Sequence, residues 1–344
     1  MKINERDDNQ ELKCCTFVKT VLMLLVVIYH SMVFWGGRWL GKPTYESEFL
    51  KILSIWLNTF HIYTFTLVSG YIFSYLKYDK NKYAVYSQFI VNKIKRLVVP
   101  YLFVVSVWVI PFAVIFLKVT IKDIFVKYIL CTSPDQLWFL WMLFGVFLLV
   151  WPLSTIIKNN YVALVIIFLS WCVSIFGRML FENIFCVWTS CGYLPFFIIG
   201  MKIQQNKDIF LRKIPNIVYI LLDFVVYVIY LLLANMNCNF AIVTCVLFLL
   251  QVIGALMAFF TLQEIAQRYT QWENNRVFKI VSKNSMGIYL FHQQVIYITV
   301  TYLNGKINPY FNALINFIIA FIVAFIISDI LLKFKVTRFL MGEK

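Results

Sequence analysis

Residues 16–35 read TFVKTVLMLLVVIYHSMVFW, an apolar run that contains one lysine, Lys19, and one histidine, His30. A helix rises 1.5 Å per residue, so a run of about 20 residues crosses the roughly 30 Å hydrocarbon core of a bilayer. Polar residues precede the run, and further apolar runs follow it instead of a small-residue cleavage site. The run therefore predicts a first membrane span that is retained, preceded by a tail over residues 1–15.

Further apolar runs of similar length follow along the rest of the chain. Of its 344 residues, 62% are hydrophobic and 14% are charged, and the mean hydropathy is +0.80, outside the range of ordinary soluble domains. We therefore expect an all-α fold, a polytopic membrane helix bundle of about ten transmembrane helices. Its transmembrane domain should cover residues 16–333, followed by a tail over 334–344. The apolar runs that predict spans are 16–35, 52–76, 97–117, 136–156, 160–177, 187–201, 215–234, 239–262, 284–303 and 310–332.

The charge of the chain points to a membrane orientation rather than to nucleic acid. The formal net charge is +15, but the basic residues lie in loops between apolar runs and form no soluble basic face. If the N-terminus is inside, 23 of the 31 lysine and arginine residues fall in inside segments. Both termini are therefore predicted to be cytoplasmic. Eight cysteines without CxxC spacing indicate neither a zinc site nor a redox motif, and we expect no metal.

All three histidines, His30, His61 and His292, lie within predicted spans. An ionisable side chain at that depth costs at least a few kcal/mol unless it faces a partner or a cavity. By helical rise, His30 lies about 9 Å and His61 about 13 Å below the outer surface, so these two could meet. For each histidine the structural alternative is a packing hydrogen bond to a neighbouring helix.

Lys19 and His30 are eleven residues apart, which brings them within about 20° of the same helix face and separates them by roughly 16 Å along the axis. One elongated ligand could therefore touch both, although Lys19 could also be an anchor that reaches the interface. Lys93 and Arg96 are three residues apart at the inner mouth of the third span, where they suit a phosphate-rich ligand. Basic residues beside a membrane are expected in any case.

Two further polar features have open interpretations. Asp223 lies within an apolar run, where it could pair with a polar group in the bundle or belong to a proton path. Trp138 lies at the outer start of the fourth span, where tryptophans form interfacial belts but could also contact a substrate.

Taken in order, these segments resemble the acyltransferase 3 family of membrane acyltransferases, known chiefly for O-acetylating bacterial surface polysaccharides. The similarity covers nearly the whole chain. The family usually has arginine at the positions of Lys19 and Lys93, and lysine keeps the charge but lacks the planar fork that binds phosphate. The matching residues are Lys19 and His30 with ten residues between them, FHIYTFTLVSGY with His61 and Ser69, Lys93 and Arg96 before Pro100, LWFLW with Trp138, and NSMGIYLFH with Ser285 and His292.

The resemblance implies a membrane-bound O-acyltransferase that takes an acyl group from cytoplasmic acyl-CoA, with acetyl-CoA as donor substrate and no tightly bound cofactor. The expected acceptor is a hydroxyl of a cell-surface glycan or its lipid-linked precursor, and the expected location is the bacterial cytoplasmic membrane, with further envelope-assembly partners. His30 is the predicted general base. The predicted donor-binding residues are Lys19, Lys93 and Arg96, and the supporting or substrate-contacting residues are His61, Ser69, Trp138 and His292.

Two other classes of protein fit the same residues. A membrane transporter or flippase for a glycan precursor or small polar solute would line its pathway with them. A non-catalytic scaffold for envelope assembly would use them for packing. The mass of the product distinguishes these possibilities, because only the enzyme adds an acyl group to the acceptor.

Overall fold

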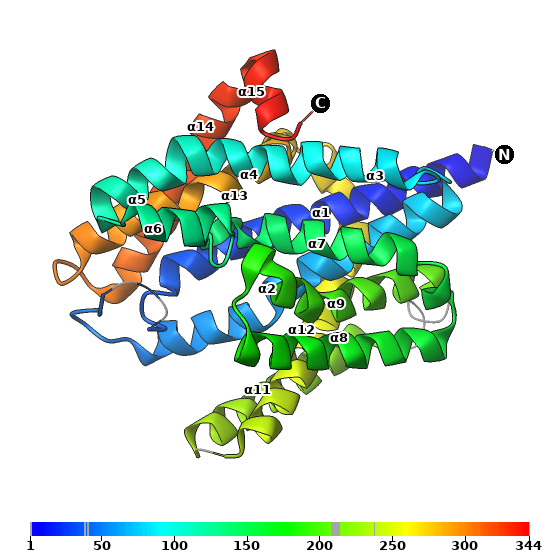
Figure 1. Ribbon diagram of the computed structural model, residues 1–344, viewed down its shortest axis with the longest axis horizontal. Coiled ribbons are helices and arrows are strands. Elements are labelled where there is room, and N and C mark those ends of the chain that lie inside the picture. Colours follow the sequence, from blue (N-terminus) through cyan, green and yellow to red (C-terminus); the bar gives the residue numbers. More distant parts are fainter. Residues whose placement is uncertain (1, 38, 40, 208–213, 237, 344) are drawn as a thin grey trace.

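The computed structural model describes residues 2–37, 39, 41–207, 214–236 and 238–343. Within these residues the fold is all-α, and the long helices run back and forth between two ends of one bundle (Figure 1). We call the end at which the first helix begins the near end, and the opposite end the far end. The longer helices are α1 (Lys2–Met32), α2 (Glu48–Ser74), α7 (Trp138–Leu153), α8 (Asn160–Leu180), α9 (Val187–Gln205), α11 (Asn216–Asn235), α12 (Phe240–Arg268), α13 (Arg276–Leu303) and α14 (Pro309–Lys333).

Shorter helices complete the bundle. Residues 86–117 form one path of α-helical pieces joined by π-helical turns, which bend without ending the helix. The short elements are η1 (Tyr75–Asp79), α3 (Tyr86–Lys93), η2 (Ile94–Val98), α4 (Val99–Val104), η3 (Val105–Val109), α5 (Ile110–Leu117), α6 (Ile121–Ile124), η4 (Phe125–Ile129), η5 (Asp135–Leu137), η6 (Ile156–Lys158), η7 (Ile184–Cys186), η8 (Thr270–Glu273) and α15 (Lys335–Leu340).

Asparagine side chains cap the N-termini of several of the long helices. Asn159, Asn239, Asn275 and Asn308 each accept a hydrogen bond from a backbone N–H of the first turn of α8, α12, α13 and α14. Such a cap satisfies donors that have no partner inside the helix. Asn239 also confirms the turn predicted between the seventh and eighth apolar runs, since α11 ends at Asn235.

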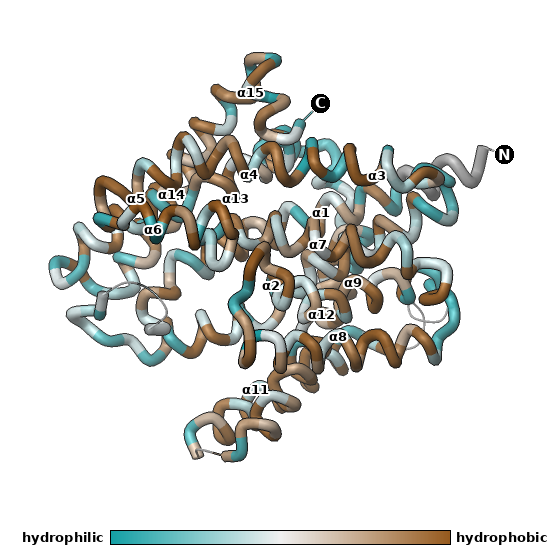
Figure 2. Tube along the Cα trace, in the orientation of Figure 1, coloured by the Kyte–Doolittle hydropathy of each residue, from teal (hydrophilic) through white to brown (hydrophobic). Residues whose placement is uncertain are grey.

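Nine helical segments of the described chain are long and apolar enough to cross a membrane, so the protein is a multi-pass membrane protein. Figure 2 shows mostly apolar residues along α8 and more polar residues in the loops at the ends of the bundle. Exposed side chains such as Phe168, Phe176 and Phe224 fit contact with lipid. The spans are Gln10–Met32, Glu48–Asp79, Tyr86–Leu117, Asp135–Leu153, Asn160–Leu180, Ile184–Gln205, Asn216–Asn235, Phe240–Arg268 and Pro309–Lys333.

The expected ninth span, 284–303, is the second part of α13 (Arg276–Leu303), which is not among the nine segments. This helix packs against α1 and α14 inside the bundle. Its composition is too polar for a helix that faces lipid. The polar residues Asn284, His292 and Gln294 are buried against protein instead. Its polar side chains therefore belong to the interior of the bundle.

Helix α2 lies at the centre of the fold and contacts α9 through two glycines. A Cβ atom on Gly70 would lie 2.0 Å from the carbonyl oxygen of Phe197, and one on Gly200 would lie 1.9 Å from that of Leu67. Any larger residue at either position would push the two backbones apart, so the glycines permit the close contact that small residues provide between membrane helices. Gly70, part of the SG pair at the end of the second span, thus has a packing role.

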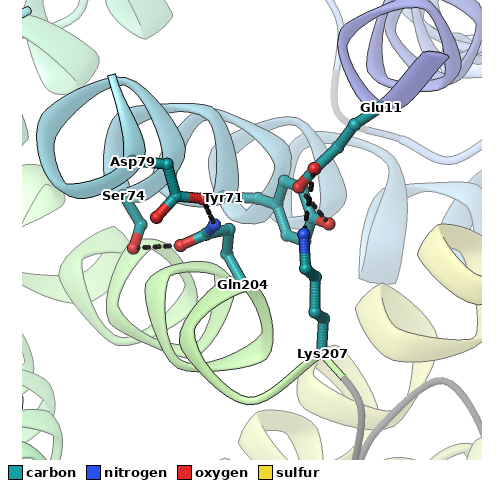
Figure 3. Close-up of polar contacts among 6 residues, drawn as sticks. All are labelled: Glu11, Tyr71, Ser74, Asp79, Gln204 and Lys207. Atoms are coloured by element: carbon teal, nitrogen blue, oxygen red, sulfur yellow. Dashed lines mark hydrogen bonds and ion pairs between the residues drawn. The ribbon is translucent and has the colours of Figure 1, made fainter. Parts of the chain in front are cut away.

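Polar contacts join α1, α2 and α9 at the near end (Figure 3). The Tyr71 hydroxyl donates to Glu11 Oε1 at 2.8 Å, and Lys207 Nζ lies 3.2 Å from Glu11 Oε2. On the same side, the Ser74 hydroxyl donates to Gln204 Oε1 at 2.7 Å. The segment expected as an N-terminal tail is thus the first part of α1, and from Gln10 onward it packs against the bundle.

Asp223 ties α11 to α2. Its Oδ2 accepts a hydrogen bond from the indole N–H of Trp56 at 2.8 Å, and the side chain is buried. Of its two interpretations, the structure supports a packing contact in the bundle.

The C-terminal segment expected as a tail turns back onto the bundle after α15. Gly342 has a φ of +75°, and a Cβ atom there would lie 2.9 Å from the carbonyl oxygen of Arg96. Residues 341–343 therefore lie directly against η2. Arg212 and Lys213, two of the basic residues assigned to the inside, lie outside the described residues, as does Lys344.

Candidate active site

His30 of α1 and His292 of α13 form a hydrogen-bonded pair. His292 Nε2 lies 3.0 Å from His30 Nδ1, although the two residues are 262 positions apart in the chain. His292 is fully buried, whereas His30 keeps part of its surface accessible. The fold thus joins two of the three intramembrane histidines.

The partners of the two rings determine which nitrogens carry protons. His292 Nδ1 lies 2.7 Å from the carbonyl oxygen of Tyr289 and 3.1 Å from that of Ile288, and carbonyls only accept, so Nδ1 is the donor. Nε2 of a neutral His292 is then an acceptor. His30 Nδ1, which also faces the carbonyl oxygen of Val26 at 3.0 Å, must therefore carry a proton. This leaves a lone pair on His30 Nε2, which can accept a proton from a hydroxyl.

His61 lies next to this pair but bonds to its own helix. Its Nδ1 lies 2.5 Å from the carbonyl oxygen of Leu57. The Tyr29 ring lies between the two histidines, with centroids 4.8 Å from His61 and 5.0 Å from His30. Both rings therefore contact Tyr29, but the direct partner of His30 is His292.

An inner cavity of about 170 Å³ leads from the near end toward the histidine pair. Lys19 and Val26 both line it and are seven residues apart on α1, so it extends about 10 Å along the helix. Apolar side chains form most of its wall, together with Ser69 and Ser285. Its deep part reaches Val26 and Tyr289, whose carbonyl groups orient His30 and His292. Neither histidine lines the cavity, which therefore ends about one helical turn short of His30.

Positive charge gathers at the mouth of the inner cavity. Lys19 and Arg96 both line it, and in the part of the chain that the structure describes neither forms an ion pair. Glu343 of the C-terminal turn lies at the same mouth. Two cations with one carboxylate favour an anionic ligand, and the Arg96 guanidinium suits phosphate oxygens.

Lys93 lies outside the lining of this cavity. Its ammonium lies 3.7 Å from the centroid of the Phe147 ring and 5.1 Å from that of Phe89, a cation–π arrangement. The π-helical turn η2 begins directly after Lys93, so the α-helical spacing that placed Lys93 and Arg96 on one face does not apply. Lys93 nevertheless remains close enough to Lys19 and Arg96 for their charges to interact.

Ser69 and Trp138 lie near different cavities. Ser69 lines the inner cavity, and its hydroxyl donates to the carbonyl oxygen of Phe65 at 2.9 Å. Trp138, the first residue of α7, lines an outer cavity of about 490 Å³ at the far end together with Arg178 and Asp135. Ser69 and Trp138, which were predicted to belong to one site, therefore line two separate cavities.

Two residues that line the inner cavity, Tyr289 and Glu343, were not predicted from the sequence. Tyr289 carries a signal that could have identified it, since it follows Ser285 by four residues and precedes His292 by three, spacings that share one helix face. Glu343 carries no such signal, because only the turn after α15 brings it to the mouth. Among the described residues, no group of three His, Cys, Asp or Glu side chains could hold a metal ion.

A protein-family model with the description Acyltransferase domain matches residues 14–333, nearly the whole chain. The match includes the histidine pair and the basic residues at the cavity mouth, and it ends before the C-terminal turn. No curated protein and no solved structure matches the chain.

Proposed function

The chain belongs to the acyltransferase 3 family and is a membrane acyltransferase. We propose that it transfers an acyl group from cytoplasmic acyl-CoA to a hydroxyl of a cell-surface glycan or its lipid-linked precursor. Acetyl-CoA is the proposed donor substrate. The observation that carries the proposal is the inner cavity, which has cations at its mouth and extends to Val26 and Tyr289, whose carbonyl oxygens contact the His30–His292 pair.

Lys19 and Arg96 bind the donor phosphates at the mouth of the inner cavity. Lys93 adds positive charge from outside the cavity lining. A second near-end cavity, of about 620 Å³, shares Glu343 with the first. Its lining includes Trp272 and the basic residues Lys13, Lys279 and Lys283; Lys13 pairs with Glu273 at 2.6 Å. Cations beside an indole ring suit a phosphorylated nucleotide with a flat base. The narrow apolar wall of the inner cavity then suits the extended arm that carries the thioester.

His30 Nε2 takes the proton of the acceptor hydroxyl while the hydroxyl oxygen attacks the thioester carbonyl carbon. The carbon–sulfur bond then breaks, and the proton passes from His30 to the departing thiolate. During this cycle His30 is briefly a cation, and its Nδ1–H donates to His292 Nε2, which stabilises the charge. His292 is thus a positioning residue, held by the backbone carbonyl of Tyr289. Ser69 and Ser285 lie along the path of the thioester, and His61 supports the pair through Tyr29.

The proposed orientation has the near end and both termini in the cytoplasm of a bacterial cell. Two observations support it: 23 of the 31 basic residues lie in sequence segments assigned to the inside, and the two near-end cavities carry basic side chains. A cytoplasmic, highly phosphorylated donor would enter from this side.

The test uses membranes that contain the full-length protein, acetyl-CoA labelled in the acetyl group, and envelope glycan from cells that lack the protein. The proposal expects label in the glycan and a mass increase of one acetyl group per modified site. A transporter or flippase would move the glycan without changing its mass, and that result would contradict the proposal.

A further inference from the structure

The outer cavity at the far end has an aromatic wall that donor binding does not use. The rings of Tyr63 on α2 and Tyr193 on α9 stack with centroids 4.7 Å apart and an interplanar angle of 7°. The Trp138 ring lies 5.5 Å from that of Tyr193. All three side chains line the cavity, and those of Trp138 and Tyr63 are partly exposed. A ligand in the cavity would therefore meet aromatic surface.

The same cavity holds a cation and a carboxylate. Arg178 at the end of α8 is exposed and, within the described residues, has neither an ion-pair nor a hydrogen-bond partner. Its guanidinium lies over Gly192, where a Cβ atom would come within 3.1 Å of a guanidinium nitrogen. Asp135 accepts a hydrogen bond from the Tyr128 hydroxyl at 2.8 Å. Arg178 can only donate hydrogen bonds and ionised Asp135 can only accept them.

The backbone around the outer cavity is strained and cross-connected. Of the six non-glycine residues with positive φ in the described chain, Asp135 and Cys186 line the cavity, and Cys131 and Phe185 directly adjoin lining residues at its rim. The two rim segments are joined by the Phe185 N–H, which donates to the carbonyl oxygen of Leu130 at 2.7 Å. Such conformations persist when the surrounding structure holds them, and they gather at functional sites.

The outer cavity approaches the inner cavity from the opposite end of the bundle. Adjacent residues at the start of α7 face different cavities, with Trp138 in the outer and Phe139 in the inner lining. On α2, Tyr63 lines the outer cavity and Ile62 the inner one. The two cavities therefore border the same stretch of α2 and α7.

We propose that the outer cavity binds a sugar ring of the acceptor glycan, with Trp138 against a face of the ring and with Arg178 and Asp135 on its hydroxyl groups. This rests on the proposed function and assigns a binding site to the acceptor named there. The C–H groups on a sugar face carry partial positive charge, which the negative face of an aromatic ring attracts. Each sugar hydroxyl both donates and accepts, and therefore needs the two opposite partners that Arg178 and Asp135 supply. A lipid acyl chain would use neither.

The test compares acceptor kinetics for variants of the full-length protein in membranes. The donor is labelled acetyl-CoA, and the acceptor is the oligosaccharide fraction released by mild acid from the envelope of cells that lack the protein. Trp138→Leu removes the aromatic face, whereas Trp138→Phe keeps one. Arg178→Gln removes the cation, and Lys122→Gln, an exposed far-end site on α6 outside the cavity lining, is the matched control.

We expect Trp138→Leu and Arg178→Gln each to raise the KM for oligosaccharide about tenfold, while kcat and the KM for acetyl-CoA stay near wild type. Trp138→Phe should restore most of the acceptor KM, and Lys122→Gln should change nothing. A KM does not depend on the amount of folded enzyme, so partial misfolding would not imitate this pattern.

Three results would overturn or redirect the inference. An unchanged oligosaccharide KM in both Trp138→Leu and Arg178→Gln would show that the cavity does not bind the acceptor. Failure of Trp138→Phe to restore the KM would contradict ring stacking. Labelling of only lipid or peptide by the wild type would contradict the sugar class. If the wild type transfers acetyl to nothing, the proposed function itself fails, which is a different outcome from all three.

Discussion

Replacement of His292 by alanine tests whether this residue acts through His30. The change removes the acceptor that lies 3.0 Å from His30 Nδ1. A hydrogen bond to a charged group contributes about 1.5–3 kcal/mol, and the His30 cation exists only during the reaction. Since about 1.36 kcal/mol corresponds to a factor of ten in rate, we expect kcat to fall roughly 10- to 150-fold. The KM for acetyl-CoA should stay unchanged, because His292 lies beyond the donor mouth.

His292→Gln separates this role from packing. The glutamine side-chain oxygen can still accept from His30 Nδ1, so we expect kcat within about tenfold of wild type. Gln293→Ala is the matched control, since it removes a neighbouring buried side chain of α13. The assay is transfer of labelled acetyl to envelope glycan, normalised to folded protein in the membrane. A kcat for His292→Ala within about threefold of wild type would refute the reasoning.

Three further predictions follow from the cavity mouth, the helix packing and the proposed orientation. Arg96→Ala should raise the KM for acetyl-CoA at least about tenfold with little loss of folded protein, and Lys19→Arg should be tolerated; donor titration with equal protein amounts checks both. Gly70→Ala should destabilise the fold by about 1–3 kcal/mol or more, because its Cβ would lie 2.0 Å from a carbonyl oxygen; thermal unfolding in detergent measures this. A cysteine introduced at 41–47 should react with an impermeant reagent in intact cells, and one at 335–343 should not; the reverse result would contradict the orientation.

The spans were predictable because lipid imposes a simple requirement on sequence: long apolar helices. The expected span at 284–303, which is not apolar enough to be selected by composition, is explained by the same requirement. Helix α13 contacts other helices on more of its surface, so it carries buried amides and His292 where a lipid-facing helix could not. Composition therefore identifies the helices that face lipid better than those that face protein.

The candidate site was only partly predictable, because local spacing fixes a helix face but not the partner across the bundle. The spacing of Lys19 and His30 indicated a shared helix face; Lys19 lines the inner cavity, whereas His30 lies one helical turn beyond Val26, the last residue of α1 in that lining. The contact of His30 with His292 depends on how α1 and α13 pack, and no local pattern encodes that. For Lys93, the π-helical turn η2 broke the assumption of regular α-helical spacing.

The central claim is that His30 removes the proton of the acceptor hydroxyl, and His30→Ala tests it most directly. The measurement is the acyl content of envelope glycan, normalised to protein in the membrane, for wild type, His30→Ala and His61→Ala. Loss of a general base lowers the rate by a factor of about 10² to 10⁴, so we expect His30→Ala to insert, accumulate and leave the glycan almost unacylated. Near-normal acylation by His30→Ala would contradict the account, and loss in His61→Ala alone would move the base to the second helix.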